Sequence, residues 1–95
     1  MKKRILVFGK TASLMELVLG KFKREGWDAD AAYSVKQAVR KLGEIEYDAL
    51  VVGGGIDLPT RTDLQRHITN EFPKTKMINA FQGSMVNQVK EALSA

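Results

Sequence analysis

The residues of this 95-residue chain that could bind a ligand lie in two loops that contain glycine. Each loop follows an apolar run that predicts a buried strand, and neither contains a carboxylate, a cysteine or a histidine. Backbone N–H groups of glycine loops and helix N-termini, together with nearby cations, are donors that receive small anions. The sequence therefore predicts a site that could bind a small anion or a phosphorylated ligand but could not catalyse a reaction. The candidate residues are Gly9, Lys10, Thr11, Gly53, Gly54, Gly55 and Arg61.

A second interpretation of the same loops is purely structural. Glycine permits tight turns and close helix packing because it has no side chain. Gly9-Lys10-Thr11 also resembles the end of a Walker P-loop, but the upstream glycine that this loop requires is absent. Nucleotide hydrolysis is therefore not expected.

The remaining reactive residue types are scarce. Cysteine is absent, which excludes disulfides, thiolate nucleophiles and cysteine metal sites. His67 is the single histidine, and we interpret it as a residue at the margin of a helix, with Asp63 in the first turn of that helix. Asp57 is the one acid expected near the glycine loops, and hard cations usually need several oxygen ligands. We expect no catalytic residue, no metal, no cofactor and no enzyme activity.

Length and composition indicate one domain, residues 1–95, with 44% hydrophobic and 27% charged residues. The net charge is +4, but the 15 lysines and arginines are spread along the chain, so nucleic-acid binding is not expected. No apolar run approaches the roughly 18 residues of a membrane span. We expect a cytoplasmic protein that does not enter membranes.

Apolar runs and amphipathic stretches alternate four times, which predicts an α/β fold of the (βα)₄ type with a parallel sheet. The two most apolar strands belong in the centre, which gives a four-stranded sheet of order 2-1-3-4 in a three-layer sandwich. A sheet of this width needs two helices on each face, so the last helix should lie beside the first. The predicted strands are 3–8, 27–33, 48–53 and 75–80, and the predicted helices are 13–25, 35–45, 62–72 and 84–94.

Helix boundaries carry local signals. Ser13 with Glu16 and Ser34 with Gln37 both fit the capping box, and Gly26 is placed to end the first helix. Helical spacing predicts three buried stripes. They consist of Leu14, Leu17, Val18 and Phe22; of Val35, Ala38, Val39 and Leu42; and of Met85, Val86, Val89 and Leu93.

The sequence resembles a response-regulator receiver domain, the flavodoxin-like phosphoacceptor module of two-component signalling. The similarity covers about residues 3–80 and depends on pattern and turn placement. It is carried by Arg4-Ile5-Leu6-Val7-Phe8, Gly26-Trp27-Asp28-Ala29, Ser34 to Leu42, Tyr47-Asp48-Ala49-Leu50-Val51-Val52, Ile56-Asp57-Leu58-Pro59 and Lys76-Met77-Ile78-Asn79-Ala80.

The resemblance also implies departures from the family. Where receivers have two acids that hold magnesium, this chain has Gly9 and Lys10, and the phosphoacceptor aspartate falls on Gly53 or Gly55. The switch Ser or Thr falls on Asn79. A fifth strand and its Lys-Pro pair have no counterpart. Small phosphotransferase-system IIB subunits share a four-stranded plan, but their phosphocysteine is missing here.

The leading hypothesis is a degenerate, receiver-like signalling or protein-interaction module that is not phosphorylated on aspartate. The alternatives are the anion or phosphorylated-ligand binder at the Gly53–Gly55 loop and an inactive or truncated piece of a longer fold. The partner would be another protein or a second copy, because strand 75–80 leaves an open sheet edge that Lys74, Lys76 and Asn79 could instead protect. The expected interaction surface is Met77, Ile78, Phe81 and Met85.

Overall fold

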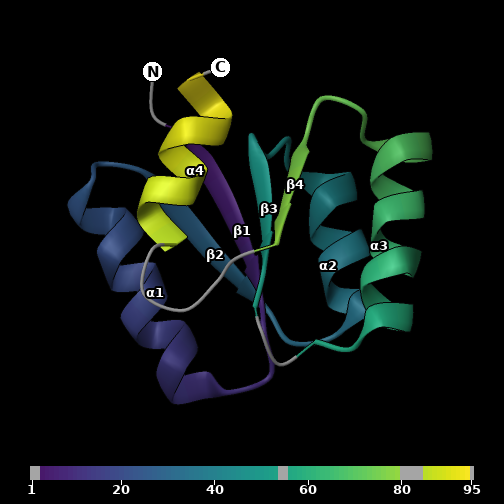
Figure 1. Ribbon diagram of the computed structural model, residues 1–95, viewed down its shortest axis with the longest axis horizontal. Helices are drawn as coiled ribbons and strands as arrows, with labels where there is room; N and C mark the ends of the chain where they lie inside the picture. Colours follow the sequence, from purple (N-terminus) through teal and green to yellow (C-terminus); the bar gives the residue numbers. More distant parts are fainter. Residues whose placement is uncertain (1–2, 54–55, 80–84, 95) are drawn as a thin grey trace.

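The computed structural model describes residues 3–53, 56–79 and 85–94 of the chain; of residues 85, 86 and 94 it describes the backbone alone. Four strands and four helices alternate along this part of the chain (Figure 1). They are β1 (Arg4–Phe8), α1 (Ala12–Arg24), β2 (Asp28–Ala32), α2 (Val35–Glu44), β3 (Ala49–Val52), α3 (Leu58–Glu71), β4 (Lys76–Asn79) and α4 (Met85–Ser94).

The sheet is parallel, with the order β2-β1-β3-β4, so the predicted (βα)₄ architecture and strand order are confirmed. Ile5 of β1 pairs with Ala29 of β2 and Ala49 of β3, and Ala49 in turn pairs with Lys76 of β4. Helices α1 and α4 cover one face and α2 and α3 cover the other (Figure 1). The last helix therefore lies beside the first, as expected.

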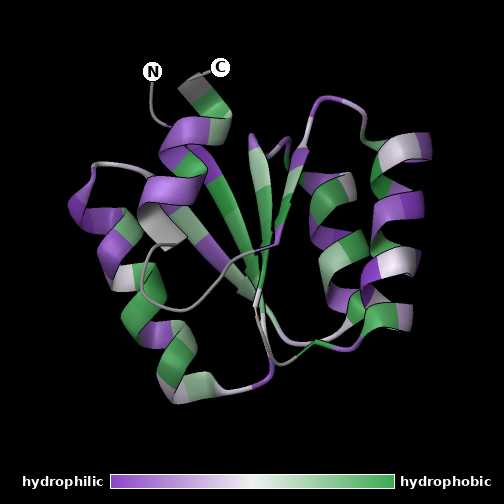
Figure 2. Cartoon of the chain, in the orientation of Figure 1, coloured by the Kyte–Doolittle hydropathy of each residue, from purple (hydrophilic) through white to green (hydrophobic). Residues whose placement is uncertain are grey.

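Burial follows from this layering. All four residues of β3 and residues 5–8 of β1 are buried, because helices cover both faces of the central strands. Figure 2 shows the hydrophobic residues of these central strands between the two layers of helices. Edge strand β4 differs, since Met77 and Ile78 are only half-buried and Lys76 and Asn79 are exposed.

In helix α1, the predicted N-cap and part of the predicted buried stripe are wrong. It begins at Ala12 with Thr11 as its N-cap, so Ser13 lies inside the helix and caps nothing. Met15 and Phe22 form the buried face, whereas Leu14 and Leu17 are 55% and 64% exposed. The sheet-facing stripe is thus rotated away from Leu14 and Leu17, although both hydrophobic sets have helical spacing.

Helix α3 begins four residues earlier than predicted. Asp57 is its N-cap, and the carboxylate accepts a hydrogen bond from the Thr60 backbone N–H at 2.9 Å. Pro59 falls in the first turn, where a missing N–H costs no helical hydrogen bond. Residues 58–61, which precede the predicted helix, are therefore its first turn.

Two other helix signals are confirmed. The Ser34 hydroxyl accepts from the Gln37 N–H at 3.1 Å, and the Gln37 side chain reaches back to the N–H of Tyr33. Gly26 follows α1 with a φ of 81°, a left-handed conformation that glycine adopts without strain. In the described part of the chain, no helix is long and apolar enough to cross a membrane.

Candidate functional site

The two glycine loops meet at the carboxyl ends of β1 and β3. A Cβ atom on Gly53 would lie 3.4 Å from the Phe8 carbonyl oxygen and 3.9 Å from the Gly9 Cα atom. Two of the expected backbone donors are already used, since the Gly9 N–H donates to the Ala32 carbonyl at 3.2 Å and the Gly53 N–H donates to the Phe8 carbonyl at 2.9 Å. These two amides extend the sheet. Gly54 and Gly55 lie outside the described residues.

Gly9 has a clear packing role. It is buried, and a Cβ atom at this position would lie 2.6 Å from the Met15 sulfur. Met15 is 4% exposed and occupies the core between α1 and the sheet. Glycine at this position therefore leaves room for the Met15 side chain at the end of β1.

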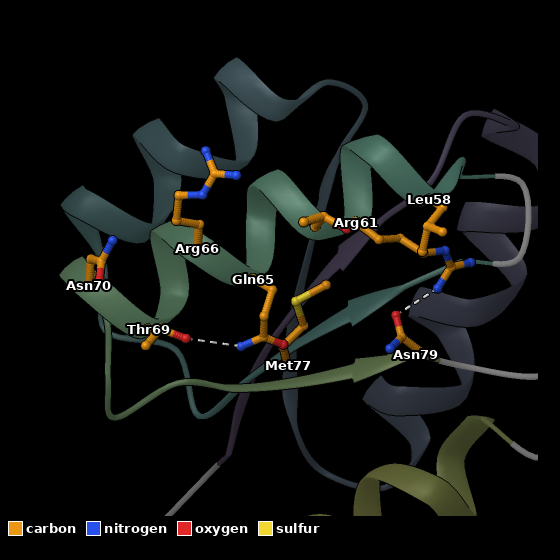
Figure 3. A pocket seen from close by; sticks show the side chains of 9 residues that line it. Leu58, Arg61, Gln65, Arg66, Thr69, Asn70, Met77 and Asn79 are labelled. Atoms are coloured by element: carbon orange, nitrogen blue, oxygen red, sulfur yellow. Dashed lines mark hydrogen bonds between the residues drawn. The ribbon is translucent and has the colours of Figure 1, made fainter.

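Arg61 is bound within the protein. Its guanidinium donates from Nε to the Ile56 carbonyl at 2.9 Å, from Nη2 to the Gly53 carbonyl at 2.7 Å, and from Nη1 to Asn79 Oδ1 at 2.6 Å. Figure 3 shows the contact with Asn79. The planar fork of arginine suits such multiple contacts. Arg61 thus joins the β3–α3 connection to the end of β4.

Asp57 and Lys10 are two charged residues at this edge of the sheet. Hydrogen bonds from Thr60 lower the pKa of the Asp57 carboxyl, and the positive charge of Lys10 acts in the same direction. Both side chains are exposed. Thr11 completes the predicted set as the N-cap of α1, but its side chain makes no cap hydrogen bond. The candidate residues that the structure describes therefore gather at one edge, and most of their donors are used internally.

Carboxylates are sparse at this edge. In the described loops that follow the strands, residues 9–11, 33–34, 53 and 56–57, Asp57 carries the one carboxylate. Residues 3–53, 56–79 and 85–94 contain no group of three or more His, Cys, Asp or Glu side chains that could hold a metal ion.

Two polar clusters lie away from the glycine loops. The Tyr47 hydroxyl donates a hydrogen bond at 2.8 Å to Asp30, an exposed residue of edge strand β2. The buried Thr75 hydroxyl donates to the Tyr47 carbonyl at 2.7 Å. On α3, His67 Nδ1 lies 2.6 Å from Glu71, and Nε2 lies 4.0 Å from Asp63. The i+4 spacing of His67 and Glu71 was the signal available for that pair.

The predicted interaction surface is described in part. Met77 and Ile78 are half-buried on β4, where Met77 contacts the core on the α3 side and Ile78 contacts the core on the other side. Phe81 lies outside the described residues, as does the side chain of Met85.

Comparisons with known proteins support the fold. No protein-family model and no curated protein sequence matches the chain. Among solved structures, it is similar to the chemotaxis response regulator CheY4 of Vibrio cholerae, with a TM-score of 0.69 and 14% identity over 100% of this chain and 82% of that chain. A response regulator from Thermotoga maritima gives a TM-score of 0.73 and 20% identity over 95% of this chain and 78% of that chain.

A third similar structure is the Thermotoga maritima response regulator TrrA in complex with Mg²⁺–BeF. Its TM-score is 0.64 and its identity is 18%, over 96% of this chain and 98% of that chain. These similarities establish the flavodoxin-like fold of receiver domains for this chain. The fold expected from the sequence resemblance is thereby confirmed.

Proposed function

We propose that this chain is a non-catalytic, receiver-like signalling module that binds a protein partner and is not phosphorylated on aspartate. One observation carries the proposal. The residues that follow β1 and β3 are Gly9, Lys10 and Gly53, and the nearest carboxylate, Asp57, caps α3.

The physical reason is charge. An incoming phosphoryl group carries negative charge, which receivers offset with a magnesium ion held by neighbouring acids. Here the acidic pair is replaced by a glycine and a lysine, and a lysine beside Asp57 would repel a divalent cation. Phosphorylation of Asp57 would also remove its ability to cap α3 with the same geometry. Partner binding needs none of these groups.

Binding of a small anion is the second candidate. Lys10 is exposed beside the start of α3, where a helix N-terminus favours negative charge. It has less support, because the Gly9 and Gly53 amides and the Arg61 guanidinium bond to the protein itself. Inorganic phosphate titrated to millimolar concentration tests it: shifts of the Gly53 and Thr11 amides that Lys10→Ala abolishes would support the site.

The leading proposal is tested with beryllofluoride, which mimics a phosphoryl group on aspartate. We expect the amide spectrum of the labelled protein to stay unchanged on addition of beryllofluoride with magnesium. Magnesium alone is the control for cation binding, and a receiver that retains its acidic pocket is the positive control. Beryllofluoride-dependent shifts centred on Asp57 would refute the proposal.

A further inference from the structure

Strand β4 is one of the two edges of the sheet, and the other edge is β2. The Lys76 N–H donates to the Asp48 carbonyl beside β3, at 3.1 Å. Backbone groups alternate in direction along a parallel strand, so those of Met77 and Asn79 point away from β3. Outside the ladder with β3, neither nitrogen donates to the backbone of any residue that the structure describes. Among the described residues, these outward groups are therefore available to an added strand.

A groove runs along this edge. Two adjoining hollows of about 460 Å³ each share Gln65 and Thr69 of α3 and Met77 of β4. The first continues past Arg66 towards Asn79, and the second reaches Ala92 of α4. Figure 3 shows the α3 side chains Gln65 and Thr69 standing over β4 beside Met77. An extended segment on the β4 edge would lie against these walls.

The charges of the groove are of one sign. Arg61, Arg66 and Lys76 line the two hollows, and no aspartate or glutamate is among the described residues that line them. The chain as a whole has a net charge of +4. Complementary charge favours an acidic occupant.

Lys76 does not block strand addition to β4. An edge lysine prevents strand addition when its ammonium projects into the path of the incoming chain. Here the Lys76 ammonium donates to the Ala92 carbonyl of α4, so it is held at the side of the strand. A second copy of this chain is a poor occupant, because its own Arg66 and Lys76 would be brought close to the same cations.

We propose that the β4 edge binds an extended acidic segment of a partner protein by strand addition, between α3 and α4. The inference rests on the proposed function as a partner-binding module and names the chemistry of the partner. The outward groups of Met77 and Asn79 give the backbone pairing. Every second side chain of the segment then lies on the α3 side of the sheet. There, apolar side chains can contact Met77 and acidic side chains can pair with Arg66.

The probe is a capped nonapeptide of alternating glutamate and valine, titrated into the labelled protein without magnesium or phosphoryl donor. We expect shifts of the Met77 and Asn79 amides, with affinity that falls as salt is added. The same peptide with lysine in place of glutamate should bind at least about tenfold more weakly. The same peptide N-methylated on every residue has no backbone donor on either edge and should lose binding.

Charge reversal on the protein distinguishes binding in the groove from a general electrostatic attraction to the positively charged protein. Arg66 and Arg24 are both exposed, but Arg66 lies in the groove and Arg24 ends α1 on the opposite face. Both Arg66→Glu and Arg24→Glu change the net charge by the same amount. We expect Arg66→Glu to weaken binding at least about fivefold and Arg24→Glu to weaken it less than twofold.

Equal losses in the two variants, or no shifts at Met77 and Asn79 at millimolar peptide, would overturn the proposal. Concentration-dependent shifts of these amides without peptide, together with a dimer mass in sedimentation equilibrium, would also overturn it in favour of a second copy. The proposed function is tested separately, because beryllofluoride-dependent shifts of the amide spectrum would refute it. That response leaves the peptide result unaffected, because the titration contains neither magnesium nor beryllofluoride.

Discussion

Arg61 Nη1 donates a hydrogen bond to Asn79 Oδ1 at 2.6 Å, which joins α3 to the last residue of β4. In the receiver resemblance, the switch Ser or Thr falls on Asn79. Here the side chain at that position is held by an arginine that also bonds two backbone carbonyls of the β3–α3 connection. This arrangement fits a fixed edge of the sheet better than a residue that moves in response to a phosphoryl group.

Replacement of Arg61 tests this structural role. Arg61→Ala removes three hydrogen bonds and should lower the free energy of unfolding by about 2 kcal/mol, measured by urea denaturation. Arg61→Lys should recover little of this, because one ammonium cannot reach three acceptors. Arg66→Ala on the exposed side of the same helix is the control, with an effect within about 0.5 kcal/mol. Wild-type stability of Arg61→Ala would show that the three contacts are not maintained in solution.

Gly9→Ala tests the close approach of α1 to β1. The added methyl group overlaps the buried Met15 side chain, so we expect a loss of about 1 kcal/mol or more in the free energy of unfolding. Gly20→Ala is the matched control in α1. Apart from its chain neighbours and the backbone of its own helix, no described atom lies within 4 Å of a Cβ there, and alanine favours the helix, so a gain of up to about 1 kcal/mol is expected. Effects of the same sign for both variants would contradict the assigned role of Gly9.

Tyr47 should make stability depend on alkaline pH. Burial raises the pKa of the Tyr47 hydroxyl above its ordinary value, and the hydrogen bond to Asp30 adds to the rise. The folded state therefore keeps this proton at a pH where the unfolded state has lost it. The free energy of unfolding should fall above about pH 10, with a limiting slope of about 1.4 kcal/mol per pH unit.

Tyr47→Phe should remove this alkaline decline, and Tyr33→Phe, which alters an exposed ring, should retain it. Denaturation curves recorded from pH 8 to about pH 11 measure both. A decline that persists unchanged in Tyr47→Phe would assign it to other groups.

Asp57 is predicted to act as a helix cap and not as a phosphoacceptor. Its pKa is lowered by hydrogen bonds from Thr60, so its contribution to stability is present above the pKa of an unfolded aspartate, about 3.9, and is lost as pH falls through the folded value. Asp57→Ala should lower the midpoint of thermal unfolding at neutral pH. Asp57→Asn should restore most of the loss, since asparagine also caps helices, but without this acid dependence. Equal loss in both variants would contradict a capping role.

The architecture could be predicted from the sequence because hydrophobic pattern decides it. The continuous apolar runs of β1 and β3 indicate central strands, and that placement fixes the strand order. The start of α3 could not be predicted in the same way. Asp57 and Pro59 fit a loop as well as a first helical turn, and only tertiary packing decides between them.

The candidate site was predicted less well. Gly9, Lys10, Gly53 and Arg61 do come together, because the carboxyl ends of adjacent parallel strands share one edge. The acceptors of their hydrogen bonds depend on side-chain rotamers and on the register of the strands. The spacing of residues in the sequence reveals neither. The same limit applies to Leu14 and Leu17, whose spacing is helical although the buried face belongs to Met15 and Phe22.

Incubation with acetyl phosphate and magnesium, followed by intact mass measurement, tests the central claim most directly. We predict that the protein mass stays unchanged, because the residues after β1 and β3 offer neither an acidic pair nor a free phosphoacceptor carboxylate. Asp57→Asn should behave identically. A hydroxylamine-labile gain of one phosphoryl group in the wild-type protein that is absent from Asp57→Asn would contradict the account.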